Sequence, residues 1–188
     1  MTSDLEESDG SPLVVDTSAV INILGCGAGA SLLRSLGRIC IVEERVLAEL
    51  THHPIPLRDA QQEVQDLVSE GLFNVIRMDD DDYDLFLELS ASSGHPGLGV
   101  GESAAIAIAT RRRHVVVLDD RKARRRTGTQ HPELRQMSSA TVLLEAARAG
   151  GLSLEETRAL FTSAIDNAGM CILKEERNLV VHLNLDGI

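Results

Sequence analysis

The chain has 188 residues, the usual size of one domain, and 43% of them are hydrophobic, which is enough for a sizeable core. Only 2% are aromatic and Trp is absent, which argues against a platform that stacks the bases of single-stranded nucleic acid. The formal net charge of −11 repels nucleic acid at long range, so such a partner needs a local basic patch or a bound cation.

The cysteines and the N-terminus indicate where the protein works. Cys26, Cys40 and Cys171 are widely separated and show no CxxC spacing, which fits reduced, buried thiols. The acidic residues 1–11 lack the basic and apolar segments of a signal peptide, and no apolar run approaches the ~20 residues of a transmembrane helix. We expect a cytoplasmic protein without membrane association, with residues 1–11 as a disordered tail.

Short apolar runs alternate with helical patterns along the chain. Apolar strands without polar alternation predict a mostly parallel central sheet that is covered by helices on both faces, and thus an α/β fold. The end of the chain, 171–183, alternates enough to predict a β-hairpin with its turn near 175–178. The expected strands are 13–15, 39–42, 73–76 and 115–118, and the expected helices are 17–24, 30–36, 43–50, 59–70, 81–90, 102–112, 121–126, 139–149 and 153–168.

Four acidic positions lie beside small or apolar residues in this pattern: Asp16, Glu49, Glu102 and the pair Asp119 and Asp120. Burying an unpaired carboxylate is costly, so a buried cluster usually implies a cation. Two of the positions follow strands and Glu102 opens a helix, so three of the four can meet beyond the carboxyl ends of the strands. Divalent cations with oxygen ligands commonly act on phosphates. The sequence therefore predicts metal-dependent phosphodiester chemistry.

Each acid also has a simpler structural explanation. Asp16 could cap a helix or form a turn, and Glu49 could be an ordinary exposed helix residue. Glu102 could be a first-turn acid that the helix dipole favours, and Asp119 and Asp120 could cap the helix that begins at Arg121. Only their joint order points to a shared site, and a metal-dependent phosphatase is a competing interpretation.

Two dense basic runs, 111–113 and 121–126, flank the predicted strand that delivers the aspartates. Because basic side chains bind phosphates, we expect RNA contacts from four of these residues: Arg121, Arg124, Arg125 and Arg126. A solvated face that pairs with nearby acids explains the same residues equally well.

Four motifs carry a resemblance to a known family: VVDTSAVINIL near the start, then VLAEL, LGVGESAAIAIA and VVVLDDRKARR, followed by a Ser/Thr stretch at 138–141. In this order, over residues 13–149, the chain resembles the PIN-domain family in its toxin-type, VapC-like ribonuclease branch. The resemblance implies a three-layer α/β/α sandwich and an endonuclease that needs Mg²⁺ or Mn²⁺ to cleave RNA. It also implies a homodimer and an antitoxin protein as partner.

The family's motifs also imply a role for individual residues. The family usually carries Thr-x-Asp where this chain has Leu118, Asp119 and Asp120, which favours Asp120 as the fourth acid, whereas Asp119 lies nearer the strand end. The metal ligands are then Asp16, Glu102 and one of these aspartates. The implied catalytic acids are Asp16, Glu49, Glu102 and Asp120, with Asp119 as the alternative, and the supporting hydroxyls are those of Thr17 and Ser139.

We therefore expect a PIN-like nuclease domain over residues 12–150. Residues 151–188 carry no motif and are expected to form a helix and the hairpin, packed on the same domain. The alternative function is a non-catalytic PIN-like module that binds RNA or protein, and the presence of every acidic position argues against it.

Overall fold

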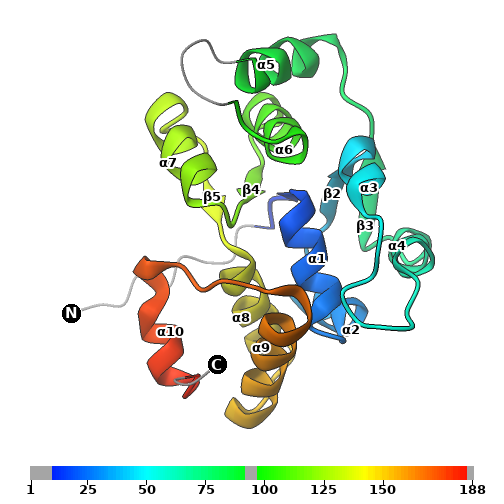
Figure 1. The fold of residues 1–188 in the computed structure, drawn as a ribbon, viewed down its shortest axis with the longest axis vertical. Coiled ribbons are helices and arrows are strands. Elements are labelled where there is room, and N and C mark those ends of the chain that lie inside the picture. Colours follow the sequence, from blue (N-terminus) through cyan, green and yellow to red (C-terminus); the bar gives the residue numbers. More distant parts are fainter. Residues whose placement is uncertain (1–9, 92–96, 186–188) are drawn as a thin grey trace.

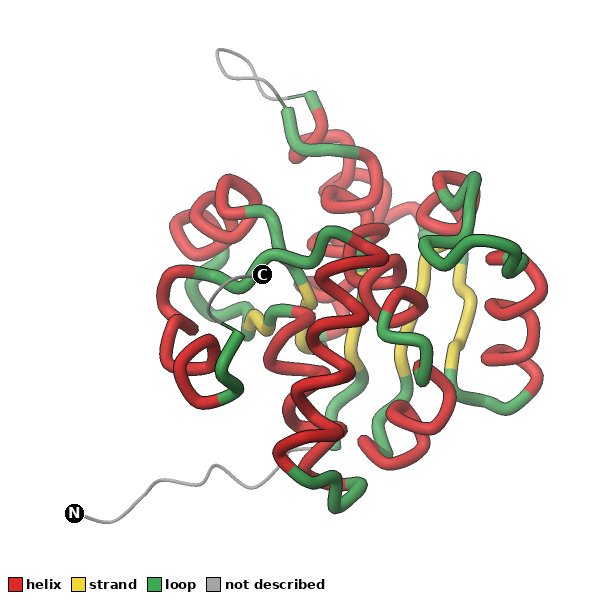
Figure 2. Tube along the Cα trace, turned by 60° about the horizontal axis from the view of Figure 1, so that its bottom comes forward, coloured by secondary structure: helices red, strands yellow, loops and turns green. Residues whose placement is uncertain are grey.

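The computed structural model describes residues 10–91 and 97–185, and within these ranges five short strands form one sheet. Every pair of neighbouring strands is parallel, and the order is β3-β2-β1-β4-β5. Helices cover both faces of the sheet, so the predicted α/β/α sandwich is confirmed (Figures 1 and 2). The strands are β1 (Leu13–Val15), β2 (Cys40–Glu43), β3 (Phe73–Ile76), β4 (Val115–Val117) and β5 (Gln136–Met137).

The helices follow the predicted pattern closely, with boundaries shifted by one or a few residues. The described α-helices are α1 (Thr17–Gly25), α2 (Gly29–Leu36), α3 (Glu44–Glu49), α4 (Ala60–Ser69), α5 (Asp80–Ser90), α6 (Val100–Arg112), α7 (Arg121–Gln130), α8 (Ser139–Ala149), α9 (Leu154–Ala168) and α10 (Arg177–His182), with a 3-10 helix, η1 (Lys174–Glu176), directly before α10.

Alternate strand residues feed two separate hydrophobic cores. Leu13 and Val15 point to a core shared with α1, α2, α4, α8 and α9, whereas Val14 and Val116 point to a core shared with α5, α6 and α7. All four side chains are fully buried, as expected for a parallel sheet with two covered faces.

The parallel arrangement places every strand's carboxyl end at one edge of the sheet. At this edge a polar side chain caps the next helix: Glu43 caps α3, Asp16 caps α1, Asp120 caps α7 and Ser138 caps α8. Because short side-chain acceptors satisfy the free N–H groups of a helix start, this edge collects acids and hydroxyls.

The predicted C-terminal β-hairpin is wrong, because residues 174–182 are helical. A hairpin would place Leu179, Val181 and Leu183 on one face. In the structure Leu179 and Leu183 are buried, but Val181 is 73% exposed, so burial follows the helical period. The strand β5 was not predicted, because its two residues, Gln136 and Met137, carry no apolar run.

Other expectations concern the ends of the chain and the cysteines. Residues 1–9 of the predicted tail lie outside the described residues, but Ser11 is held in place: its carbonyl oxygen accepts a hydrogen bond from Arg38 (2.8 Å) and its hydroxyl accepts one from Arg135 (2.9 Å). Cys26 and Cys40 are buried free thiols, whereas Cys171 is exposed, contrary to expectation.

No single helix in the described part of the chain is long and apolar enough to cross a membrane. The helices α1 and α2 meet the length and composition criteria only as a pair, with a bend of 110° between them. The division of the chain near residue 150 stays a prediction.

Candidate functional site

Asp16 is a buried acid, 2% exposed, at the junction of β1 and α1. Its carboxylate accepts hydrogen bonds from the backbone N–H of Ala19 (2.7 Å) and from the hydroxyl of Ser18 (2.9 Å). The pKa of Asp16 is raised to about 7, chiefly by burial; the Ala19 and Ser18 hydrogen bonds oppose this shift, and the charges of Asp119 and Glu102 add to it. Without a cation, the Asp16 carboxyl group is therefore partly protonated at neutral pH.

Asp119 links two helices at the same edge. Its Oδ2 accepts hydrogen bonds from Asn22 Nδ2 in α1 (2.8 Å) and from the hydroxyl of Ser139 at the start of α8 (2.5 Å). Its Oδ1 accepts one from the backbone N–H of Ser139 (2.8 Å). Both carboxylate oxygens are thus fixed in direction.

Glu102 forms the other side of the acidic edge, in the first turn of α6. Its Oε2 accepts a hydrogen bond from the backbone N–H of Gly99 (2.9 Å). Burial raises the pKa of Glu102, as do the charges of Asp120 and Glu49, while the Gly99 hydrogen bond and Lys122 lower it. Glu102 therefore connects Asp16 electrostatically to these two further acids.

The hydroxyl of Thr17 donates a hydrogen bond to Oε2 of Glu49. The start of α6 packs directly against this pair, because an added Cβ at Gly101 would overlap the Thr17 hydroxyl and lie 3.0 Å from Glu49 Oε2. A side chain at position 101 would therefore have to displace the Thr17–Glu49 pair, whereas glycine lets α6 bring Glu102 to the edge with that pair intact.

We call Asp16, Glu49, Glu102, Asp119 and Asp120 the acidic rim. The structure brings all five into one electrostatic group, but in the described residues no three His, Cys, Asp or Glu side chains are grouped closely enough to hold a metal ion. Each carboxylate is instead turned toward a local donor, and Asp16, Glu102 and Asp120 take the capping roles that the sequence also allowed.

Asn22 belongs to this site and was not predicted. Its side chain is buried, and its amide donates to Asp119 from the second turn of α1. The signal in the sequence is a lone amide inside the apolar stretch 20–24, since a buried polar group requires a partner.

The predicted RNA-binding arginines of α7 divide into two kinds. Arg121 and Arg125 are exposed and line a cleft of about 380 Å³ together with Arg124, Gln136 and Glu175. Arg124 is less exposed, and its guanidinium donates to the carbonyl oxygens of Leu118 (3.1 Å) and Met137 (2.9 Å), while Arg126 donates to Gln130 (2.9 Å). Arg124 thereby joins the ends of β4 and β5.

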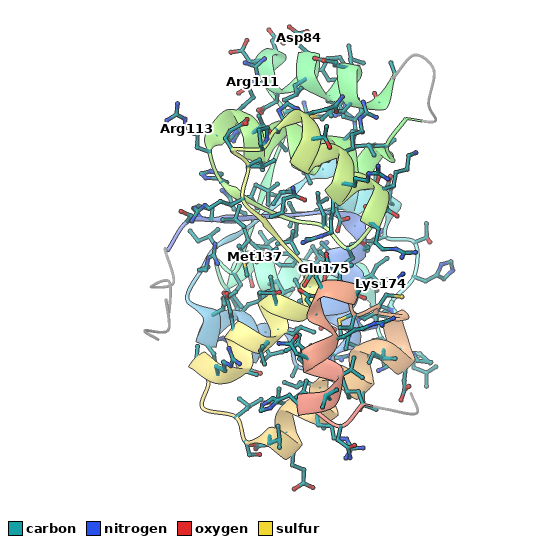
Figure 3. The ribbon with its side chains drawn as sticks, turned by 90° about the vertical axis from the view of Figure 1, so that its left-hand side faces the viewer. Asp84, Arg111, Arg113, Met137, Lys174 and Glu175 are labelled. Carbon is teal, nitrogen blue, oxygen red and sulfur yellow. The ribbon has the colours of Figure 1, made fainter. Side chains whose placement is uncertain are left out.

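The basic run 111–113 directly precedes β4, as predicted, but it does not lie at the rim. It ends α6, whose first turn carries Glu102, so it lies at the opposite end of that helix. Figure 3 shows Arg111 and Arg113 in its upper part, away from Glu175 near the middle. Arg112 pairs with Asp82 (2.6 Å) and joins α6 to α5.

A parallel α/β/α sandwich with acids gathered at the carboxyl edge of its sheet is thus the class of protein that the fold and the site define. A family model described as a PIN domain matches residues 12–183, and the chain therefore belongs to the PIN-domain family, as its motifs predicted. Members are generally nucleases and typically use divalent metal ions. No curated protein and no solved structure matches this chain.

Proposed function

We propose that this protein is a metal-dependent endoribonuclease that hydrolyses RNA phosphodiester bonds. The observation that carries the proposal is the surroundings of Asp16, a buried acid whose pKa is raised by burial and by the charges of Asp119 and Glu102. Gathering like charges around a buried acid destabilises the protein unless a cation neutralises them. Membership of a family of nucleases supports the same chemistry.

The carboxylate oxygens of the rim are the type of ligand that Mg²⁺ and Mn²⁺ prefer, but among the described residues no three acids are grouped closely enough to hold an ion unless they move together. The residues that would hold the ion are Asp16, Glu102, Asp119 and Asp120. When bound, such an ion lowers the pKa of a coordinated water and stabilises negative charge on the attacked phosphate.

The surrounding residues prepare the rim for this role. Ser18 and the Ala19 N–H orient Asp16, while Asn22 and Ser139 orient Asp119. We assign Arg121 and Arg125 to the binding of RNA phosphates, since both are exposed in one cleft and Arg121 directly follows Asp120 of the rim.

The direct test is cleavage of single-stranded RNA with Mg²⁺ or Mn²⁺, in wild type and in Asp16→Asn. Asn caps helices as well as Asp does, so this variant removes charge but keeps the helix start. Asp59→Asn is the matched control, because Asp59 caps α4. We expect activity to be lost in Asp16→Asn and kept in Asp59→Asn. Equal activity in both variants, or cleavage in the presence of chelator, would contradict the proposal.

The alternative is a non-catalytic PIN-like module that binds RNA or protein. It predicts that wild type binds RNA without cleaving it in either metal, and that Asp16→Asn binds RNA equally well.

We further propose a cytoplasmic homodimer that acts as the toxin of a toxin–antitoxin pair. The support for this part is the resemblance of the four motifs to the toxin-type branch. Expression of wild type should arrest growth, whereas Asp16→Asn should not, and a small protein encoded beside the gene should relieve the arrest. Light scattering of the purified protein measures the oligomeric state.

A further inference from the structure

The segment after α9 returns to the acidic rim. Figure 1 shows it crossing the molecule from the end of α9 to the start of α10, near β5. Met170 and Leu173 are buried before η1, and Leu179 and Leu183 are buried after it. These apolar anchors on both sides hold η1 in one place.

Glu176, the last residue of η1, contacts the first turn of α8. Its Oε1 accepts hydrogen bonds from the hydroxyls of Ser138 (2.5 Å) and Thr141 (2.7 Å). Ser138 is the N-cap of α8, and its hydroxyl also accepts the backbone N–H of Thr141 (3.0 Å). A carboxylate at a helix N-terminus is favoured by the helix dipole, and hydrogen bonds to charged acceptors are strong.

The same first turn of α8 also donates hydrogen bonds to Asp119. Ser139, between the two residues that Glu176 contacts, donates both its backbone N–H and its hydroxyl to Asp119. We propose that Glu176 is a positioning residue of the acidic rim: it fixes the first turn of α8, and through Ser139 it fixes the carboxylate of Asp119.

Stability alone is a poor explanation for an acid at this place. The Oε2 atom of Glu176 is buried and finds no hydrogen-bond partner in the described part of the chain. Leaving a buried polar atom unpaired destabilises the folded state, and the neighbouring leucines already anchor the segment. The adjacent Glu175 differs, since it is exposed and lies 3.9 Å from Arg124.

The first test observes the contact itself and needs no enzyme activity. Hydrogen exchange and the proton chemical shift of the Ser139 amide, measured by NMR, report its bond to Asp119. In Glu176→Ala we expect this amide to exchange about 10-fold faster or more. Glu176→Gln keeps an oxygen acceptor and should stay close to wild type, as should the control Glu175→Ala. An unchanged Ser139 amide in Glu176→Ala would overturn the proposal.

The second test rests on the proposed function and measures RNA cleavage well below the melting temperature. We expect Glu176→Ala to lower kcat by roughly 10- to 100-fold while KM for RNA stays near the wild-type value, as is typical when a support of a metal ligand is lost. Thr141→Val, which removes one of the two hydroxyls, should lower kcat less, and Glu176→Gln should restore most of it.

A stability control separates positioning from loosening of the fold. Leu160→Ala removes a half-buried side chain of α9 and should lower the melting temperature without lowering kcat. If Glu176→Ala loses stability but keeps the wild-type kcat, the positioning role is wrong. If wild type itself shows no metal-dependent cleavage, the proposed function is wrong. The exchange rate of the Ser139 amide still tests whether Glu176 positions Asp119.

Discussion

At the scale of single residues, the capping acids of the rim also determine its charge. Asp16 and Asp120 each accept a backbone N–H of their own helix. Yet the pKa of Asp16 is raised by burial and by the charges of Asp119 and Glu102, and the charge of Asp120 contributes to the raised pKa of Glu102. An ordinary helix cap needs neither burial nor other acids close to it. Replacing Asp by Asn separates the two roles, because it keeps the cap and removes the charge.

The raised pKa of Asp16 gives a prediction about stability and pH in chelator. Between pH 3.8 and about pH 7, Asp16 is charged in the unfolded chain but protonated in the folded one, so wild type loses stability as the pH rises. Asp16→Asn lacks this loss. We expect it to exceed wild type in stability by on the order of 1–3 kcal/mol at pH 8, with no advantage below pH 4.

Denaturant unfolding at pH 4, 6 and 8 checks this prediction, with Asp59→Asn as the control that should show no such trend. Saturating Mn²⁺ should reverse the order at pH 8 by stabilising wild type selectively. A difference between wild type and Asp16→Asn that is constant with pH would show that the Asp16 carboxyl group does not titrate as the structure indicates.

Asn22 gives the second prediction at this scale. Asn22→Ala leaves Asp119 without its donor in α1 and should reduce RNA cleavage by roughly 10- to 100-fold, while destabilising the fold by about 1.5–3 kcal/mol. Asn167→Ala is matched, because Asn167 donates a hydrogen bond from α9 to the carbonyl oxygen of Gly25 (3.0 Å). It should lose about 1 kcal/mol and keep full activity. Equal activity in both variants would show that Asn22 does not support the site.

At the scale of elements, α7 combines a structural side chain with a binding face. Arg121, Arg124 and Arg125 all line the cleft, but Arg124 is hydrogen-bonded to the carbonyl oxygens at the ends of β4 and β5. Arg121 and Arg125, one turn apart, remain exposed. The five basic residues within 121–126 therefore do not form one uniform RNA-binding surface.

The two kinds of arginine predict different defects. Arg121→Gln with Arg125→Gln should weaken RNA binding and reduce the slope of log affinity against log salt by roughly 0.7 per arginine, with little loss of stability. Arg124→Gln should lower the free energy of unfolding by about 1–3 kcal/mol and change the salt slope little. Filter binding of uncleaved RNA in the Asp16→Asn background measures the slopes, and a reversal of the two patterns would refute this division.

The same contrast explains what the sequence could and could not predict. Apolar strands and capping residues such as Asp16 and Asp120 follow local rules, so the sandwich and the acidic edge were predictable from them. The Asn22–Asp119 bond, the placement of Arg124 and the contact of Glu176 join residues far apart in the chain, and no local pattern encodes them. The hairpin error is of the same kind, since the packing of Leu179 and Leu183 decides it.

At the scale of the whole molecule, the formal charge of −11 opposes the approach of RNA, and the rim concentrates part of that charge beside the proposed binding face. A bound divalent cation would then promote binding as well as chemistry. Its effect should be local, because charges are screened beyond about 8–10 Å at ordinary salt.

Two sets of variants with the same net charge test this idea. One set neutralises four acids of the rim by Asp16→Asn, Glu102→Gln, Asp119→Asn and Asp120→Asn. The other neutralises four exposed acids elsewhere by Asp81→Asn, Asp84→Asn, Glu88→Gln and Glu155→Gln. Each set changes the formal charge from −11 to −7.

In chelator, the rim set should bind RNA more tightly than wild type, and the other set should gain less, because its acids are exposed to solvent and none of them belongs to the rim. Added Mg²⁺ should tighten binding in wild type and in the other set but hardly change the rim set, since only the rim set has lost the ligands. Fluorescence anisotropy with an uncleavable RNA measures all three proteins. Equal responses of both sets to Mg²⁺ would mean that the cation acts through the overall charge and not at the rim.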